Sequence, residues 1–185
     1  MSDITKRAIS ASLKNLLREK KLNKITVQDI ADDCGINRQT FYYHFQDIYD
    51  LVEWTCIEDT EKVLKENRTY ETWQDGLLSV FDLAKKDKIF IDNIYRSVSL
   101  EVLEQYLYRL VYPLLKSVID EKAKGLSARD EDKKCIADFY KYAFVGELLE
   151  WIRNDMRESP EEIVEKISKI IGGNVERALH NFTER

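Results

Sequence analysis

The chain has 185 residues, of which 44% are hydrophobic and 34% charged, a balance that excludes an intrinsically disordered protein. It contains no apolar stretch long enough for a membrane span and no apolar leader, so we expect a cytoplasmic protein without a membrane partner. The 3 Cys and 2 His are widely spaced. They lack the spacing of a metal or redox site, so we expect free thiols, no metal and no cofactor.

The net charge of −5 is unevenly distributed along the chain. Residues 1–50 contain 8 Lys and Arg against 7 Asp and Glu, whereas residues 51–185 contain 21 against 27. A DNA-binding face needs only a few local cations. The N-terminal part therefore remains compatible with DNA despite the acidic total.

Helical periodicity runs through most of the chain, and the small numbers of Gly (6) and Pro (2) also favour helices. The first predicted helix covers residues 5–20 and carries one apolar stripe. A short second helix follows Thr26, which forms a capping-box pattern with Asp29, and Gly35 ends that helix. Asn37 is the expected N-cap of the third helix.

Two short helices that meet at a glycine must turn sharply, which predicts a helix-turn-helix. Its inward side chains are apolar: Ile30, Ala31, Ile36, Phe41 and Phe45. Large polar and aromatic side chains are left outward on the third helix: Arg38, Gln39, Tyr42 and Tyr43. A plain three-helix bundle with no role in DNA binding would be better served by Lys and Glu at these positions.

The outward side chains suit a major groove. Arg38 can pair with guanine or a phosphate, and Gln39 can pair with adenine. Hydroxyl, imidazole and ammonium groups nearby can contact phosphates, although Lys6, Lys24 and His44 are equally well explained as solvated surface residues. The predicted DNA-binding residues are Thr26, Asn37, Arg38, Gln39, Thr40, Tyr42, Tyr43, His44, Lys6 and Lys24.

Further helices are expected over most of the remaining sequence. A connecting helix over 47–66 is followed by a polar junction at 67–70. Pro113 should kink one of the later helices, and Ser159, Pro160 and Glu162 give a specific start signal for the last one. The expected later helices are 71–86, 89–96, 100–124, 129–157 and 160–182.

These elements predict an all-α fold with two domains. Residues 1–46 form the helix-turn-helix domain, and residues 47–185 form a larger helical domain for effector binding and dimerisation. The last two predicted helices have wide apolar faces, which favours a four-helix contact between two copies. The predicted dimer residues are Phe144, Leu148, Trp151, Ile152, Ile167, Ile170 and Ile171.

Aromatic side chains elsewhere in the second domain suggest a ligand pocket, for which core packing is the simpler explanation. The predicted pocket residues are Trp73, Phe81, Tyr95, Tyr106, Tyr108 and Tyr112, with Leu77 and Phe90 as further candidates. The sequence offers no nucleophile–base pair, glycine-rich phosphate loop or metal constellation, so we expect no enzyme.

The run 25–51 resembles the DNA-binding motif of the TetR family of bacterial regulators. The matching pieces are Ile30-Ala31, Cys34-Gly35-Ile36-Asn37, Thr40-Phe41-Tyr42-Tyr43-His44-Phe45 and Leu51. The Arg38-Gln-Thr-Phe-Tyr version of the motif, the region of Tyr70 and Trp73, and the run from Phe144 to Trp151 also resemble the branch of dihydroxyacetone-kinase operon regulators. Gln39 stands where the family often has a small residue and suggests an extra base contact, whereas Ile48 replaces a common lysine and removes a phosphate contact.

The resulting hypothesis is a homodimeric, sequence-specific transcription regulator on a palindromic operator, modulated by a small molecule or a partner protein. The alternative is a helical protein-interaction module whose DNA contact is secondary or lost.

Overall fold

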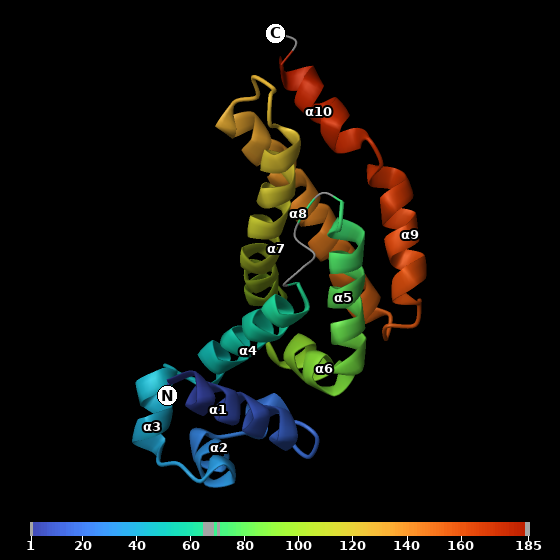
Figure 1. The fold of residues 1–185 in the computed structure, drawn as a ribbon. Coiled ribbons are helices and arrows are strands. Elements are labelled where there is room, and N and C mark those ends of the chain that lie inside the picture. The colour runs from blue at the N-terminus through green and yellow to red at the C-terminus, as the bar shows by residue number, and fades with distance from the viewer. Residues whose placement is uncertain (1, 65–68, 70, 184–185) are drawn as a thin grey trace. The chain divides into compact units, whose positions relative to one another are not determined.

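The computed structural model describes residues 2–64, 69 and 71–183. Every regular element among these residues is a helix, which confirms the predicted all-α class (Figure 1). None of the described helices is both long and apolar enough to cross a membrane. The chain divides into two compact units, residues 1–61 with 87–100 (unit 1) and residues 62–86 with 101–185 (unit 2).

Unit 1 is built around the first helix of the chain. Its buried stripe packs on the second and third helices. The first helix is shorter than expected and ends at residue 16 rather than 20. The elements of unit 1 are α1 (Ser2–Leu16), a 3-10 turn (Leu22–Lys24), α2 (Val27–Cys34), α3 (Arg38–His44), most of α4 (Ile48–Val63) and α6 (Lys88–Ser97).

The start and stop signals of the helix-turn-helix are confirmed. The Thr26 hydroxyl accepts a hydrogen bond from the Asp29 N–H, and the Asp29 carboxylate accepts one from the Thr26 N–H, which completes the capping box. Gly35 ends α2 with φ 68°, a left-handed conformation that glycine adopts without a Cβ penalty. The Asn37 side chain caps α3 by accepting from the Thr40 N–H.

Helix α6 belongs to the same compact unit as the helix-turn-helix. It contacts the 3-10 turn, and the Asn93 side-chain amide donates to the Leu17 carbonyl oxygen at 3.3 Å. Most of α4 is also part of unit 1. The compact units group α4 and α6 with the helix-turn-helix, because their segments bond to α1 and to the residues that follow it. The expected domain boundary after residue 46 stays a prediction.

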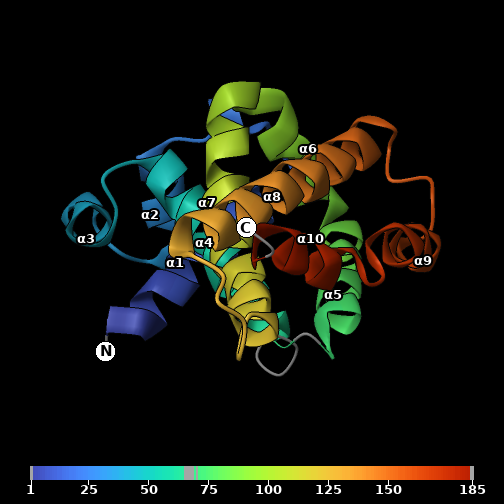
Figure 2. The same cartoon turned by 90° about the horizontal axis from the view of Figure 1, so that it is seen from above.

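Unit 2 contains the remaining helices and a separate core. Helices α5 and α9 lie side by side, and α10 packs against α8 and α9 (Figures 1 and 2). The Phe81 and Trp151 rings meet edge to face with centroids 4.9 Å apart and join α5 to α8. The elements of unit 2 are α5 (Trp73–Lys86), α7 (Leu100–Lys122), α8 (Asp130–Arg153), α9 (Pro160–Ile171) and α10 (Asn174–Thr183).

The expected single helix over 160–182 is wrong. Its start is as predicted, since the Ser159 hydroxyl accepts from the Glu162 N–H at 3.2 Å. The chain then leaves the helix at Gly172, and Gly173 has φ 73°, so the two glycines separate α9 from α10 instead of lying inside a helix. Pro113 lies inside α7 without ending it. Residues 67, 68 and 70 of the predicted junction lie outside the described residues.

Candidate nucleic-acid interface

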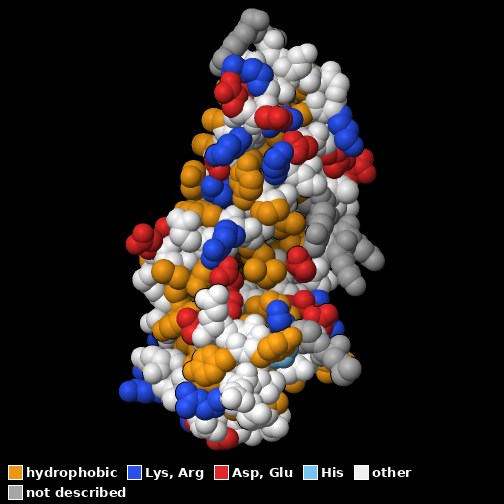
Figure 3. Space-filling model, turned by 90° about the vertical axis from the view of Figure 1, so that its left-hand side faces the viewer, with side chains coloured by type: hydrophobic (Ala, Val, Ile, Leu, Met, Phe, Trp, Pro, Cys, Tyr) orange, Lys and Arg blue, Asp and Glu red, His pale blue; other side chains and the backbone are white. Residues whose placement is uncertain are grey.

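Helix α3 presents the predicted reading surface to solvent. Phe41 is fully buried and Phe45 almost so, and these two side chains fix the helix on unit 1. Arg38 and Gln39 are exposed, as are Tyr42 (50%) and Tyr43 (83%). Figure 3 shows hydrophobic side chains beside Lys and Arg side chains over unit 1. A short, firmly packed helix thus carries four large side chains that need no partner within the fold.

Two of these four side chains are neighbours on one turn. The Arg38 guanidinium lies 5.9 Å from the centre of the Tyr42 ring, and its Nη2 lies 3.5 Å from the Tyr42 hydroxyl. The spacing of i and i+4 places both on the same helical face. Tyr42 therefore restricts the orientations of the Arg38 guanidinium, a planar group of the kind that binds base edges and phosphates.

The three predicted residues at helix starts are engaged within the chain. Asn37 Oδ1 accepts from both the backbone N–H and the hydroxyl of Thr40, at 2.8 and 3.0 Å. The Thr26 hydroxyl donates to the Asp29 carboxylate at 2.8 Å. These side chains set where α2 and α3 begin, and through that they orient the reading surface.

Asp29 connects the start of α2 to the segment after α1. Its carboxylate accepts from the Lys20 ammonium and from the Thr26 backbone N–H, both at 2.8 Å. The hydrogen bonds from Lys20 and then from Thr26 lower the pKa of Asp29 to about 2. The carboxylate is consequently charged over the whole physiological range.

The remaining predicted contacts lie on other elements or at the end of α3. Lys6 is half-buried, and its ammonium lies 5.5 Å from the Phe45 ring centre and 5.6 Å from that of Trp54. Lys24 is exposed in the 3-10 turn, and His44 is half-buried with its ring 5.0 Å from that of Tyr43. Of the ten predicted residues, Arg38, Gln39, Tyr42 and Tyr43 form the exposed set on α3.

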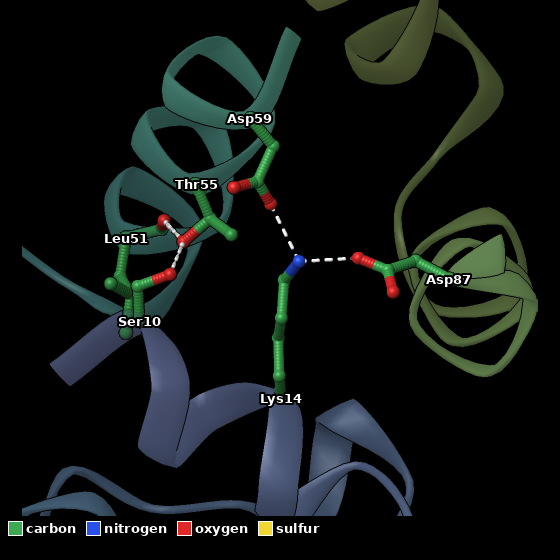
Figure 4. Close-up of polar contacts among 6 residues, drawn as sticks. All are labelled: Ser10, Lys14, Leu51, Thr55, Asp59 and Asp87. Atoms are coloured by element: carbon green, nitrogen blue, oxygen red, sulfur yellow. Dashed lines mark hydrogen bonds and ion pairs between the residues drawn. The ribbon is translucent and has the colours of Figure 1, made fainter. Parts of the chain in front are cut away.

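Polar side chains also join α1 to α4 and α6 (Figure 4). The Thr55 hydroxyl is 3.0 Å from the Ser10 hydroxyl and 2.8 Å from the Leu51 carbonyl oxygen. The Lys14 ammonium donates to Asp59 of α4 at 2.6 Å and to Asp87, the residue that precedes α6. We call Lys14, Asp59 and Asp87 the Lys14 bridge.

The Lys14 bridge holds its cation charged. Burial alone would lower the pKa of Lys14, but the hydrogen bonds and charges of Asp59 and Asp87 outweigh that effect and raise it. Sequence reasoning missed this cluster because its members are 45 and 73 residues apart. The apolar stripe of α1 does not indicate which groups the neighbouring Lys14 side chain contacts.

The thiols of unit 1 are poorly suited to redox sensing. Burial raises the pKa of Cys56 to about 12 and also raises that of Cys34, whose sulfur lies 3.6 Å from the Ala8 carbonyl oxygen. Both side chains therefore stay protonated at neutral pH.

Unit 2 contains an apolar cavity of about 90 Å³. Trp73, Leu77 and Phe81 line it, and so do Phe144 and Leu148, which the sequence had suggested for the dimer contact. Among the other pocket candidates, Tyr95 and Phe90 lie in α6 of unit 1, and Tyr106, Tyr108 and Tyr112 are not part of the lining. Tyr108 and Tyr112 instead surround the Lys141 ammonium, at 5.1 and 5.5 Å from their ring centres.

The predicted dimer residues differ in exposure. Trp151, Ile152, Ile167 and Leu148 are buried within a single chain, Phe144 and Ile171 are half-buried, and Ile170 is 70% exposed. Phe139 and Tyr142 are also exposed on α8, and neither is among the predicted dimer residues. Their spacing alone could not distinguish an inward from an outward position on a helix that is apolar over a wide arc.

Comparison with known proteins agrees with this arrangement. A model described as "Bacterial regulatory proteins, tetR family" matches residues 9–54, and one described as "Transcriptional regulator C-terminal region" matches residues 71–173. The chain is 32% identical over 94 residues to the HTH-type dhaKLM operon transcriptional activator DhaS of Lactococcus lactis subsp. lactis (strain IL1403). That match covers 51% of this chain and 50% of the relative, so it spans about half of the relative's length.

Solved structures show the same fold over nearly the whole chain. The dihydroxyacetone kinase operon activator DhaS superposes with a TM-score of 0.71 at 24% identity, covering 98% of this chain and 99% of the other. The TetR family repressor AlkX from Dietzia sp. strain DQ12-45-1b has a TM-score of 0.60 at 15% identity, covering 94% and 96%. With an α3 built to project polar and aromatic groups, and with family models matching both parts of the sequence, the chain belongs to the TetR family of DNA-binding transcription regulators.

Proposed function

We propose that this regulator acts in the cytoplasm as a homodimer that places one α3 helix of each copy in the major groove of a palindromic operator. The observation that carries the proposal is the exposure of Arg38, Gln39, Tyr42 and Tyr43 on α3. Arg38 and Gln39 provide the hydrogen-bonding groups for base edges. Tyr42 and Tyr43 provide hydroxyls for phosphates, which fix the position of the helix on the duplex.

Substitution of two cations, one proposed to recognise a base and one proposed to contact phosphates, separates base recognition from phosphate binding. Arg38→Ala should reduce the preference for the operator over unrelated DNA, at a cost of about 1–3 kcal/mol in operator binding. Lys24→Ala should weaken binding to all sequences alike and lower the salt dependence. Fluorescence anisotropy at several salt concentrations measures both, with Lys124→Ala in unit 2 as the control for charge. Wild-type affinity and specificity in both variants would refute the contact assignment.

A second copy of the chain is the proposed occupant of the exposed apolar face in unit 2. Phe139 and Tyr142 lie on neighbouring turns of α8 and are 69% and 54% exposed, and Ile170 of α9 is also exposed. Large apolar groups on neighbouring turns of a helix are typical of a protein contact. A two-fold dimer would present two recognition helices to the two half-sites of the operator. A single helix of seven residues contacts too few base pairs to select one DNA sequence.

The effector that we propose for unit 2 is an uncharged, largely apolar small molecule. The side chains that line the cavity are aliphatic or aromatic, with the Trp73 indole N–H as the sole polar group among them. A charged ligand would lose its hydration there without gaining a partner. For comparison, an apolar cavity of about 150 Å³ in another protein binds benzene. A partner protein that competes with the second copy for the exposed face of α8 remains the second candidate.

A small uncharged apolar molecule tests the effector class. Benzene, titrated by isothermal calorimetry, should bind the wild-type protein, and Leu114→Trp, which fills the cavity from its lining, should reduce that binding at least about tenfold. Val102→Trp on the exposed start of α7 is the matched control. Equal benzene binding by both variants would exclude the cavity as the site and favour the partner protein.

The genes regulated by the DhaS relative suggest where to look for the operator. That protein is described as an activator of a dhaKLM operon. We extend this to the present chain as the proposed target class, to be tested by binding to DNA upstream of dihydroxyacetone kinase genes in the same genome.

A further inference from the structure

The two compact units are joined by the chain at three places. It leaves unit 1 after residue 61, returns at residue 87 and leaves again after residue 100. Any change in unit 2 that reaches the recognition helix through the chain must pass through these connections.

The Lys14 bridge lies at two of the three connections. Asp59 lies two residues before residue 61, where the chain first leaves unit 1, and Asp87 is the residue at which the chain returns to unit 1. The side chains of Lys14, Asp59 and Asp87 are each no more than 30% exposed, so solvent screens their interaction only in part. One ammonium therefore binds both chain segments to α1.

Helix α1 in turn holds the recognition helix. It packs on α2 and on α3 through a stripe in which Ile9 and Leu13 are fully buried. Lys14 directly follows Leu13 in this helix, so the same turn of α1 is fixed to the helix-turn-helix on one face and to α4 and α6 on another. Packed side chains of α1 therefore join the recognition helix to the points where the chain passes between the two units.

The geometry of Asp87 shows that its carboxylate serves the bridge rather than its own helix. Asp87 precedes α6 at the N-cap position, where an aspartate side chain ordinarily accepts from the N–H groups of the first turn. Here it forms no such cap and bonds to Lys14 instead. Two further contacts join α6 to α1 and the segment after it. The centre of the Phe90 ring lies 5.1 Å from the Lys14 ammonium, and the Asn93 side-chain amide donates to the Leu17 carbonyl oxygen.

We infer that Lys14 is a positioning residue for DNA recognition, which fixes the end of α4 and the start of α6 to α1 and thereby holds the recognition helix in one orientation relative to them. It contacts no DNA in this role. In its absence, α1, α2 and α3 keep their own core, while α6 keeps its contacts with the 3-10 turn and with Leu17 and is held less firmly. The inference goes beyond the proposed contacts of α3 and does not depend on the identity of the effector.

Hydrogen exchange with and without DNA tests this inference. The probe is a duplex selected from a random-sequence pool by the wild-type protein. In the wild type, DNA should slow amide exchange in residues 27–44 and also in residues 88–97. In Lys14→Met, the slowing in 27–44 should persist while that in 88–97 is lost, and the dissociation constant for the duplex should rise about fivefold. Lys14→Arg, which can bind both carboxylates, should restore the response.

A neighbouring ion pair provides the control. Arg7 of α1 and Glu58 of α4 pair at 2.9 Å, so Glu58→Gln weakens a link between the same two helices but leaves the Lys14 bridge in place. A purely structural role of Lys14 would change thermal stability and leave the response of residues 88–97 to DNA unaltered. If Lys14→Met does not fold, Asp87→Asn replaces it with the same expectation.

The outcomes separate the two proposals. If DNA slows amide exchange in residues 88–97 of Lys14→Met as much as it does in Glu58→Gln, the role of Lys14 is overturned. Absence of that slowing in the wild type overturns it as well. Absence of any slowing in residues 27–44 of the wild type instead contradicts the proposed DNA contacts of α3.

Discussion

Single side chains in unit 1 perform several structural tasks at once. Asp29 completes the capping box with Thr26 and also binds Lys20, which connects the segment after α1 to the start of α2. Asn37 binds two groups of Thr40 and thereby begins α3. A helix of seven residues does not form by itself in water, so such caps and the burial of Phe41 are needed to hold the reading surface.

The Asp29 carboxylate should make the stability of unit 1 depend on acid pH. Its pKa is lowered to about 2 in the folded chain, from an unperturbed value of 3.8. A lowered folded-state pKa contributes stability above the unperturbed value, which is lost as the pH falls through about 2. The melting temperature of the wild type should therefore exceed that of Asp29→Asn by a constant amount above about pH 5, and the difference should shrink between about pH 4 and pH 2.

Thermal melts monitored by circular dichroism measure this difference. Asp33→Asn removes one exposed negative charge from the same helix and is the control. A difference between the wild type and Asp29→Asn that stays constant down to pH 2 would contradict the role of the carboxylate.

At the scale of elements, glycines set the ends of helices. Gly35 separates α2 from the turn that leads to α3, and Gly173 separates α9 from α10. Both have positive φ, at 68° and 73°. Without the break at Gly173, α10 could not pack on both α8 and α9, where it contributes the buried Val175 and Leu179.

Substitution of Gly173 should measure the strain that glycine avoids. A Cβ at this position meets no atom within 4 Å, so the effect isolates the backbone conformation. Gly173→Ala should lower the free energy of unfolding by about 1–2 kcal/mol. Gly173→Asn should cost less, because asparagine adopts the left-handed region more readily. Denaturant titrations check the order; equal stability of both variants and the wild type would show that the break can shift without strain.

At the scale of the whole molecule, the regulation that we propose requires that unit 1 and unit 2 act on one another and that two copies assemble. The chain passes between the units three times, and α6 is a part of unit 1 whose neighbours in sequence, α5 and most of α7, belong to unit 2. An arrangement of this kind allows a change in unit 2 to move α6 without unfolding the helix-turn-helix.

Assembly of two copies through the exposed face of unit 2 can be tested by charge. Phe139→Glu should yield monomers, because a carboxylate buried in an apolar contact is costly, while the folded monomer is unaffected at a position that is 69% exposed. Analytical ultracentrifugation measures the mass, and binding to a duplex with two half-sites should weaken more than binding to one half-site. Val102→Glu on α7 is the control; a dimeric Phe139→Glu protein would place the interface elsewhere.

The sequence by itself determined the helix-turn-helix. Thr26, Asp29, Gly35 and Asn37 act on residues no more than a few positions away, so their roles follow from short-range geometry and were predicted together with the outward set on α3. The break at residues 172–173 was missed because a glycine pair in a periodic apolar pattern fits either a close helix contact or a helix end.

Tertiary structure alone decided which distant segments meet. Nothing near Lys14 indicates Asp59 or Asp87, and nothing near α6 indicates that it contacts the 3-10 turn and the segment after α1. The same holds for the cavity of unit 2, whose lining is drawn from Leu64, α5, α7 and α8 and omits the predicted tyrosines. Caps and turns depend on local backbone conformation, whereas ion pairs and cavities depend on how whole helices pack, which a periodic pattern leaves open.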